Sequence, residues 1–262
     1  MAAADLQGPL DDFRERMFQI RSIIVAIETA AKSPGLIKTS RVNIDVSKIG
    51  TQTGNTVNAM SLIFLASSFE EFIREEISQC AGYMIDKYSG LKDETRHGVR
   101  SSYWMATLDR LKFSRSILTK KKPKIPDSVV IGKARALIEA AHGFVINDDA
   151  KFLDPTTFAQ HSNNFRPHVV NEIALRLGIS EFIAKVSDTG KIRSYFGVSK
   201  KSDAADKLRA KLDEFYDRRN ETVHSLNSAT GYAVDVILDY LEMFELAAES
   251  AKNVFAKELG AW

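Results

Sequence analysis

The feature that most constrains the fold is the stretch from Asn55 to Tyr88, in which apolar residues recur at helical spacing over the whole length. They are Met60, Ile63, Phe64, Ala66, Phe69, Phe72, Ile73, Ile77, Cys80, Met84 and Ile85. Before Phe69 these residues occupy much of the helix circumference, and a helix that is apolar on most sides is buried. We therefore predict a central core helix that other elements must surround.

Most of the remaining chain also has helical periodicity, which predicts an all-α protein. The expected helices cover about Leu10–Ala31, Asp93–Leu118, Ser128–Ala141, Phe165–Leu177, Ser180–Val186, Ser202–Arg219 and Ala229–Leu259, the last with Ser228 as its N-cap. Residues 142–164 are expected to be mostly loop, and residues 191–201 a basic loop. Val42–Val46 alternates like a short strand, which we interpret as an extended connection that could pair across a dimer.

The length and composition are those of one globular domain with a substantial core. The chain has 262 residues, of which 44% are hydrophobic and 27% charged, so residues 1–262 are expected to form a single domain. Its core helices would be those at about 55–90 and 165–259, with an N-terminal helix at about 10–32 and a possible insertion at about 92–164.

The charge and the cysteine content of the chain limit which ligands it can bind and in which cellular compartment it is expected. The net charge is +2, so RNA binding would need local clusters of basic residues. The single cysteine, Cys80, cannot form an intramolecular disulfide and fits a reducing compartment. No apolar run approaches the ~20 residues of a membrane span, and no signal-like segment opens the chain. We therefore expect a cytoplasmic protein without membrane contact.

The residues best suited to chemistry are Arg219 and His224. A guanidinium can bind a phosphate with two hydrogen bonds, and an imidazole can exchange a proton near neutral pH. Together they could cleave a phosphodiester without a metal. On an unbroken helix, however, they would lie about 140° apart. Either the helix ends near Asn220, or a second subunit completes the site.

The local sequence favours a helix that ends at Arg219, with His224 in the following connection. Residues 224–228 are polar and turn-like. On spacing alone the simpler interpretation is structural, because lone arginine and histidine pairs are common. Arg218 and Arg219 would then only complement the helix dipole, and His224 would be a surface histidine.

Other polar clusters are weaker candidates. Lys120, Lys121, Lys122 and Arg193 could contact an RNA backbone, although solvated loops explain them equally well. Tyr195 and Phe196 could stack on bases or pack onto the bundle. The carboxylates of Glu70, Glu71, Glu75 and Glu76 are expected to form a solvated face. Neither they nor the pair His168 and Glu172 form a convincing metal site, and no cofactor motif is present.

The candidate site resembles a family signature. An arginine, a polar residue, three further residues and a histidine are typical of the HEPN superfamily, and the chain has this order in Arg219-Asn220-Glu221-Thr222-Val223-His224. With Arg218 included, the run is similar to the predicted ribonuclease branch labelled RiboL-PSP-HEPN. The segments Ser67–Ile73 and Phe165–Ile173, the latter running on to Ile179, are also similar to that branch. The likeness spans roughly residues 55–258.

The resemblance implies a helical bundle that dimerises, so that the motifs of both protomers line one cleft. It implies RNA cleavage by attack of the ribose 2′-hydroxyl, with cyclic phosphate ends and no metal or other cofactor. His224 would transfer protons, Arg219 would bind the phosphate and Asn220 would orient the site, with Arg218 a further RNA contact. Glu70 and Arg74 match a region where relatives place charged residues, although i,i+4 pairing is the simpler interpretation.

Two classes of function follow. The leading hypothesis is a homodimeric endoribonuclease that acts as a toxin or an anti-phage defence effector, with a possible antitoxin or regulatory partner protein. The alternative is a non-catalytic interaction module in which the motif is structural. An Arg219 held in a buried salt bridge would favour that alternative. A nucleotidyl-transfer accessory is less well supported, because no phosphate-binding loop is present.

Overall fold

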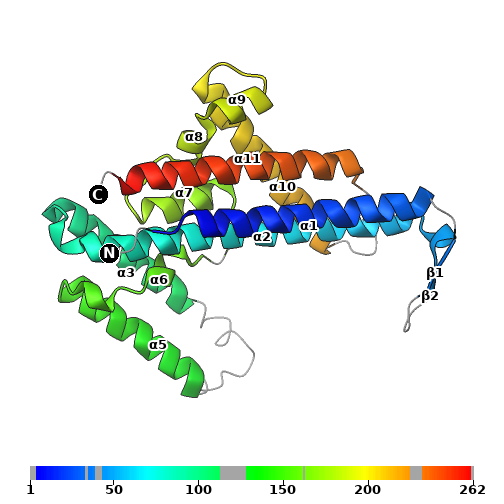
Figure 1. Cartoon of the computed structure of the whole chain (residues 1–262). Helices are drawn as coiled ribbons and strands as arrows, with labels where there is room; N and C mark the ends of the chain where they lie inside the picture. Colours follow the sequence, from blue (N-terminus) through cyan, green and yellow to red (C-terminus); the bar gives the residue numbers. More distant parts are fainter. Residues whose placement is uncertain are drawn as a thin grey trace.

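Three long helices run alongside one another and form the body of the protein (Figure 1). A computed structural model describes residues 4–32, 35–38, 43–112, 128–161, 163–224 and 232–260. The three helices are α1 (Gln7–Lys32), α2 (Thr51–Lys87) and α11 (Val234–Leu259). The predicted all-α fold is confirmed, and α2 contributes many buried residues to the core. The expectation that its first half is buried on most sides is wrong, because Met60 and Phe64 are 64% and 44% exposed. Ser228 lies outside the described residues, and α11 begins after Ala233, so the expected N-cap is wrong.

Aromatic side chains join these three helices at the centre of the core. The ring of Phe13 in α1 lies 6.3 Å from Phe69 and 5.5 Å from Phe72, both in α2. Phe69 also lies 4.7 Å from Phe244 in α11, with the rings edge to face. All four are almost completely buried, and such aromatic contacts stabilise a core beyond the area that they bury. Helix α2 is thus enclosed on two sides by helices from opposite ends of the chain.

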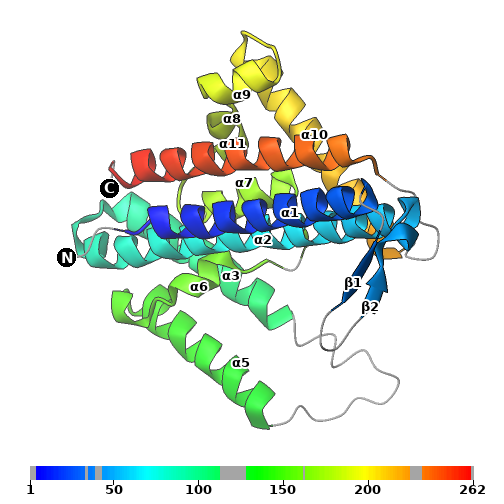
Figure 2. The same cartoon turned by 45° about the vertical axis from the view of Figure 1, so that its right-hand side comes forward.

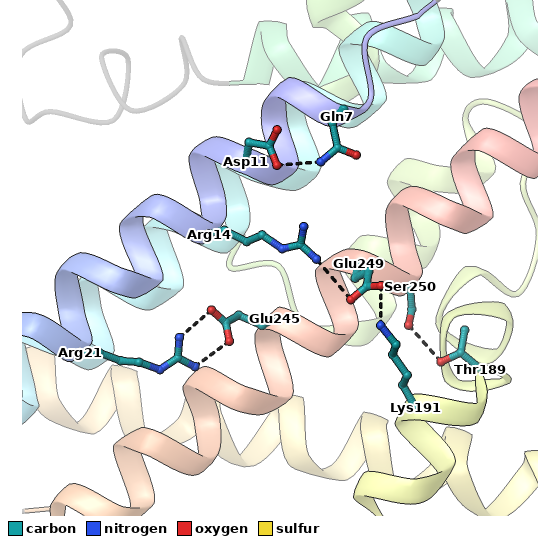
Figure 3. Close-up of polar contacts among 9 residues, drawn as sticks. All are labelled: Gln7, Asp11, Arg14, Arg21, Thr189, Lys191, Glu245, Glu249 and Ser250. Carbon is teal, nitrogen blue, oxygen red and sulfur yellow. Dashed lines mark hydrogen bonds and ion pairs between the residues drawn. The ribbon is translucent and has the colours of Figure 1, made fainter.

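Ion pairs fasten α1 to α11 at the surface of this core (Figure 3). Both terminal nitrogens of Arg21 donate to the carboxylate of Glu245, at 2.7 and 2.6 Å. This two-point bond is the main reason that the pKa of Arg21 is raised. Glu249 accepts from Arg14 at 3.3 Å and from Lys191 at 2.6 Å, and Lys191 belongs to α9 (Gly190–Tyr195). The same carboxylate therefore connects three elements.

Helix α10 (Lys201–His224) runs obliquely past the long helices (Figures 1 and 2). Its residue Phe215 packs between two aromatic residues of α11, with ring centres 5.1 Å from Tyr240 and 4.6 Å from Phe244. The buried residues Leu208 and Leu212 continue the same face, which is the stripe that the sequence predicted. This packing fixes the end of α10, where the candidate motif lies.

Shorter elements complete the structure. The helices are α3 (Asp93–Lys112), α5 (Ser128–Ala141), α6 (Pro155–Ala159), α7 (Pro167–Leu175) and α8 (Phe182–Ser187), with 3-10 turns at Val46–Lys48, Tyr88–Gly90 and Ala150–Phe152 and a π-helical turn at His142–Ile146. Helix α5 projects from the bundle in both views (Figures 1 and 2). The proposed insertion at residues 92–164 stays a prediction. None of the described helices is long and apolar enough to cross a membrane.

Two connecting segments differ from the prediction. Strand β1 (Leu36–Lys38) pairs antiparallel with β2 (Asn43–Asp45), so the expected strand has a partner within the same chain. Pairing across a dimer stays a prediction. Residues 191–201, which were expected to form a basic loop, begin inside helix α9. Thr189 precedes this helix and caps it, since its hydroxyl accepts from the backbone N–H of Ile192 at 3.4 Å. Tyr195 donates to Asp239 at 2.5 Å. Its ring lies 4.8 Å from that of Phe196, and both rings pack against the core.

The prediction that α2 presents four solvated carboxylates is wrong for Glu76. The residue is 0% exposed, and neither carboxylate oxygen has a hydrogen-bond partner among the residues that the structure describes. Burial raises its pKa to about 8, although Lys252 of α11 acts in the opposite direction. Position 76 lies one helical turn from the buried residues Phe72 and Cys80, and so faces the core. The run of carboxylates in the sequence favoured a solvated face, and the burial of Glu76 was therefore not predicted.

Candidate active site

The motif lies on the last turn of one uninterrupted helix. Helix α10 continues through Arg219 and Asn220 and ends at His224, so the expected helix end at Arg219 is wrong. Thr222 lies within this continuation. The residue is buried, which favours a helical turn packed against the protein over a solvated turn, and its hydroxyl donates to the carbonyl of Arg218 at 2.8 Å. His224 is therefore a helical residue at the exposed C-terminal end of α10.

Helical geometry places Asn220 and His224 on one face. Four residues correspond to a rotation of about 40° and a rise of about 6 Å, whereas Arg219 and His224 are about 140° apart. The long side chain of Arg219 reduces that separation, because its Nη1 donates to Oδ1 of Asn220 at 3.2 Å. The guanidinium thus lies against the residue that shares a face with the histidine. No hydrogen bond or ion pair joins the side chain of His224 to another described residue.

Asn220 is held in one amide orientation. Its Oδ1 accepts from Arg219 and also from Nδ2 of Asn164 at 2.9 Å. A guanidinium can only donate hydrogen bonds, so the atom of Asn220 that faces it must be the oxygen. The amide nitrogen of Asn220 then points elsewhere and has no hydrogen-bond partner among the described residues. It remains available as a donor to a ligand.

Arg219 keeps its positive charge unpaired within the described part of the chain. No described carboxylate lies within ion-pair distance, and its Nε is buried without a partner. Its neighbour Arg218 is different, because it forms an ion pair with Glu214 at 2.7 Å and lies 5.2 Å from the centre of the Tyr232 ring. The two adjacent arginines are thus used differently. Arg218 is engaged within the protein, and Arg219 can receive an anion.

The segment before α7 lies against the motif. The backbone N–H of Phe165 donates to Glu70 of α2 at 3.4 Å, and the guanidinium of Arg74 lies 4.5 Å from the centre of the Phe165 ring. Arg74 and Glu70 also pair at 3.5 Å, which confirms the expected i,i+4 contact. Tyr216 of α10 is buried nearby, and burial raises the pKa of its hydroxyl, with Glu70 the next cause. These contacts fix the segment between α2 and α10.

Arg166 connects the same segment to α10. Its Nη1 lies 3.4 Å from a carboxylate oxygen of Asp213, and its Nη2 lies 2.5 Å from one of Asp217. The bond with Asp217 is the main reason that the pKa of Arg166 is raised. Beside this arginine is an open pocket of about 380 Å³ that is lined by Asn163, Asn164, Arg166 and His168.

Sequence reasoning did not predict this pocket or the role of Asn164. Periodicity predicts a helix at Phe165–Leu177, but no spacing rule relates Asn164 to Asn220, which is 56 residues away in the sequence. The available signal was the coincidence of two family-like segments in one chain. The structure now brings these segments into contact.

A family model described as RiboL-PSP-HEPN matches residues 35–257. The match includes α2, the Phe165 segment and the whole motif on α10. The chain belongs to the RiboL-PSP-HEPN family. Membership in a HEPN family indicates a nuclease-like or RNA-related function for this protein. Comparisons with curated proteins and with solved structures gave no significant match.

The other candidate residues of this RiboL-PSP-HEPN chain are dispersed. Arg193 lies on α9, where its Nη1 donates to the carbonyl of Ser199 at 3.4 Å. Lys120, Lys121 and Lys122 lie outside the described residues. Their contact with RNA, like that of Arg193 and Arg218, stays a prediction.

A metal site finds no support in the described regions of the HEPN chain. They contain no group of three or more His, Cys, Asp or Glu side chains that could hold a metal ion. Glu172, considered in the sequence together with His168, forms ion pairs with His161 at 3.4 Å and with Arg176 at 3.1 Å. Its carboxylate is thus committed to structural contacts.

Proposed function

We propose that the protein is an endoribonuclease that works without a metal and uses Arg219, Asn220 and His224. The observation that carries this proposal is the state of Arg219, which has no ion pair with a described residue and is held by the neutral oxygen of Asn220. An arginine without a carboxylate partner can bind a phosphate with two hydrogen bonds. A salt bridge at this position would have favoured a structural role.

The proposed reaction is a transfer within the RNA strand. The ribose 2′-oxygen attacks the adjacent phosphorus and the bond from phosphorus to the 5′-oxygen breaks, leaving a 2′,3′-cyclic phosphate and a 5′-hydroxyl. His224 exchanges one of the two protons that move, Arg219 stabilises the negative charge that grows on the phosphoryl oxygens, and the N–H of Asn220 positions the phosphate. The departing 5′-oxygen must also receive a proton, so the reaction requires a second acid.

We propose that a second protomer supplies that acid. In a two-fold symmetric dimer with the ends of both α10 helices at the axis, two copies of His224 would flank one phosphate. The exposed position of His224 at the end of its helix supports this arrangement. The proposal also includes a role for the protein as a toxin or an anti-phage effector. The support for this role is the family resemblance.

A second candidate function, binding of a partner protein, is favoured by α5. This projecting helix exposes the apolar residues Val129, Ile131 and Ile138, which are 63%, 50% and 55% exposed. Exposed apolar side chains gathered on one element indicate an interaction surface. Such a surface is compatible with a nuclease that a regulatory protein or antitoxin restrains.

The test is RNA cleavage by the purified protein in EDTA, with total RNA and transfer RNA as substrates. We expect fragments with cyclic phosphate ends, and we expect His224→Ala and Arg219→Ala to lower the rate about a hundredfold or more. His97→Ala and Arg135→Ala are matched controls, because both residues are exposed and lie on α3 and α5. Cleavage by folded His224→Ala protein at the rate of the parent would refute the proposal.

A further inference from the structure

The pocket beside the motif is a candidate for ligand binding in its own right. Its volume of about 380 Å³ falls within the range of pockets that bind small molecules. It shares a wall with the motif, because Asn164 lines the pocket and also donates to Asn220 at 2.9 Å. A strand whose phosphate lies at Arg219 and Asn220 would therefore place a neighbouring group in or near this pocket.

The charges at the pocket argue against a phosphate as the ligand. Among the described residues of its lining, Arg166 is the one arginine, and both ends of its guanidinium fork face carboxylates, those of Asp213 and Asp217. One cation with two anionic partners offers no net attraction for another anion. The remaining polar groups of the lining are two neutral amides and an imidazole.

These groups suit a nucleobase. Bases of single-stranded RNA are recognised by hydrogen bonds to their edges and by stacking on flat side chains, including the histidine ring and the guanidinium plane. The aspartates pair with both terminal nitrogens of the Arg166 guanidinium and so hold its orientation. Asn163 and His168 are exposed at the same pocket, and an amide offers both a donor and an acceptor to a base edge.

We propose that this pocket binds one base of the RNA strand that the motif holds, with Asn163 reading the base edge and His168 stacking on the ring. The inference rests on the proposed function for the identity of the strand. It assigns the nucleotide preference to residues outside the motif. Cleavage would then be favoured at sites with one particular base at a fixed position beside the scissile phosphate.

Binding can be measured without cleavage. The parent is His224→Ala protein, and the probes are four short 2′-O-methyl RNA oligonucleotides that differ in one base, with affinities measured by fluorescence anisotropy. We expect the preferred base to bind about tenfold more tightly than the worst. Adding Asn163→Ala should remove this preference. Adding His168→Ala should weaken all four complexes about tenfold, and His168→Phe should restore much of that loss.

Several outcomes would overturn the proposal. Equal affinities for the four probes, no binding of any probe, or unchanged binding after Asn163→Ala and His168→Ala would each do so. A free nucleoside monophosphate that bound as tightly as an oligonucleotide would refute the assignment to a strand. The added substitution His97→Ala, on α3, should leave the affinities unchanged.

The two proposals can fail separately. If wild-type protein does not cleave RNA but the His224→Ala parent still binds the probes with a base preference that depends on Asn163, the ribonuclease proposal is wrong and the base pocket stands. If cleavage is normal and has no dependence on Asn163 or His168, the reverse holds. Circular dichroism of each variant confirms that it is folded.

Discussion

The side-chain amide of Asn164 donates to Oδ1 of Asn220 at 2.9 Å, and this bond joins the residue just before the Phe165–Ile173 segment to the motif. Asn220 lies in the motif on α10, whereas Asn164 lies in the segment before α7. With Arg219 as the second donor, the bond fixes which way the Asn220 amide points. Asn164 is therefore a positioning residue for the proposed site.

Replacing Asn164 with alanine should lower the rate of RNA cleavage more than it lowers RNA affinity. Without the hydrogen bond from Asn164, the amide of Asn220 can rotate. A misplaced catalytic group lowers the rate on the order of tenfold to a hundredfold. Single-turnover cleavage as a function of protein concentration separates the two effects. Asn164→Asp is a useful comparison, because a carboxylate cannot donate to Oδ1 of Asn220 and should not restore the rate. A purely structural role would instead lower the melting temperature and leave the rate of folded protein unchanged.

Asn220→Asp should preserve the fold and abolish most cleavage. The carboxylate can still accept from Asn164 and Arg219, but it now pairs with the guanidinium, which competes with the phosphate, and the outward N–H is lost. We expect thermal stability at or above that of the parent and a loss of cleavage of about a hundredfold. Melting by circular dichroism and a cleavage assay measure the two effects. Full activity in this variant would show that neither the free guanidinium nor the amide is required.

The sequence predicted the helical architecture because apolar periodicity is a local property. The stripe of α2, the stripe of α11 and the face of α10 with Leu208, Leu212 and Phe215 were all visible in the spacing. The end of α10 was less accessible. Polar residues after Arg219 suggested a turn, but Thr222 is buried and the helix continues to His224. Tertiary burial decided the boundary.

The parts that sequence reasoning missed depend on contacts between distant segments. Glu76 lies in the same run of carboxylates as the exposed Glu71, and its residue type outweighed its helical spacing from Phe72 and Cys80 in the prediction. The pairing of Arg166 with Asp213 and Asp217 likewise needs the relative position of α7 and α10. Side-chain chemistry alone singled out Arg219 and His224 as candidates, and the resemblance added Asn220 and gave each residue a role.

The buried carboxyl of Glu76 should make stability depend on pH. Its pKa is about 8 in the folded protein and 4.5 ordinarily, so the folded state binds the proton more tightly than the unfolded chain does. This contribution is fully present below about pH 4.5 and is lost at about 1.4 kcal/mol per pH unit as the pH rises towards 8. Glu76→Gln, which stays neutral, should remove that slope from the free energy of unfolding in urea. Glu71→Gln, at an exposed position, should keep it; parallel slopes for the two variants would contradict the assignment.

Phe13→Ala should destabilise the protein by about 3–5 kcal/mol, because it removes a buried ring that contacts two residues of α2. Phe13 is 1% exposed, whereas Phe18 on the same helix is 63% exposed. Phe18→Ala is therefore the matched control and should change stability by less than about 0.5 kcal/mol. Unfolding in urea, followed by circular dichroism, measures both. Equal effects would mean that α1 does not pack on α2 as described.

The family match begins at residue 35, and α1 ends at Lys32. Yet α1 contributes Phe13, Met17 and Ile20 to the same core as α2 and α11, and Arg21 bonds to Glu245 across it. A chain shortened to the matched residues would leave the α1-facing sides of both helices in water. The stretch that this protein shares with its family and the stretch that must fold as one cooperative unit are therefore different, and the second includes the first helix.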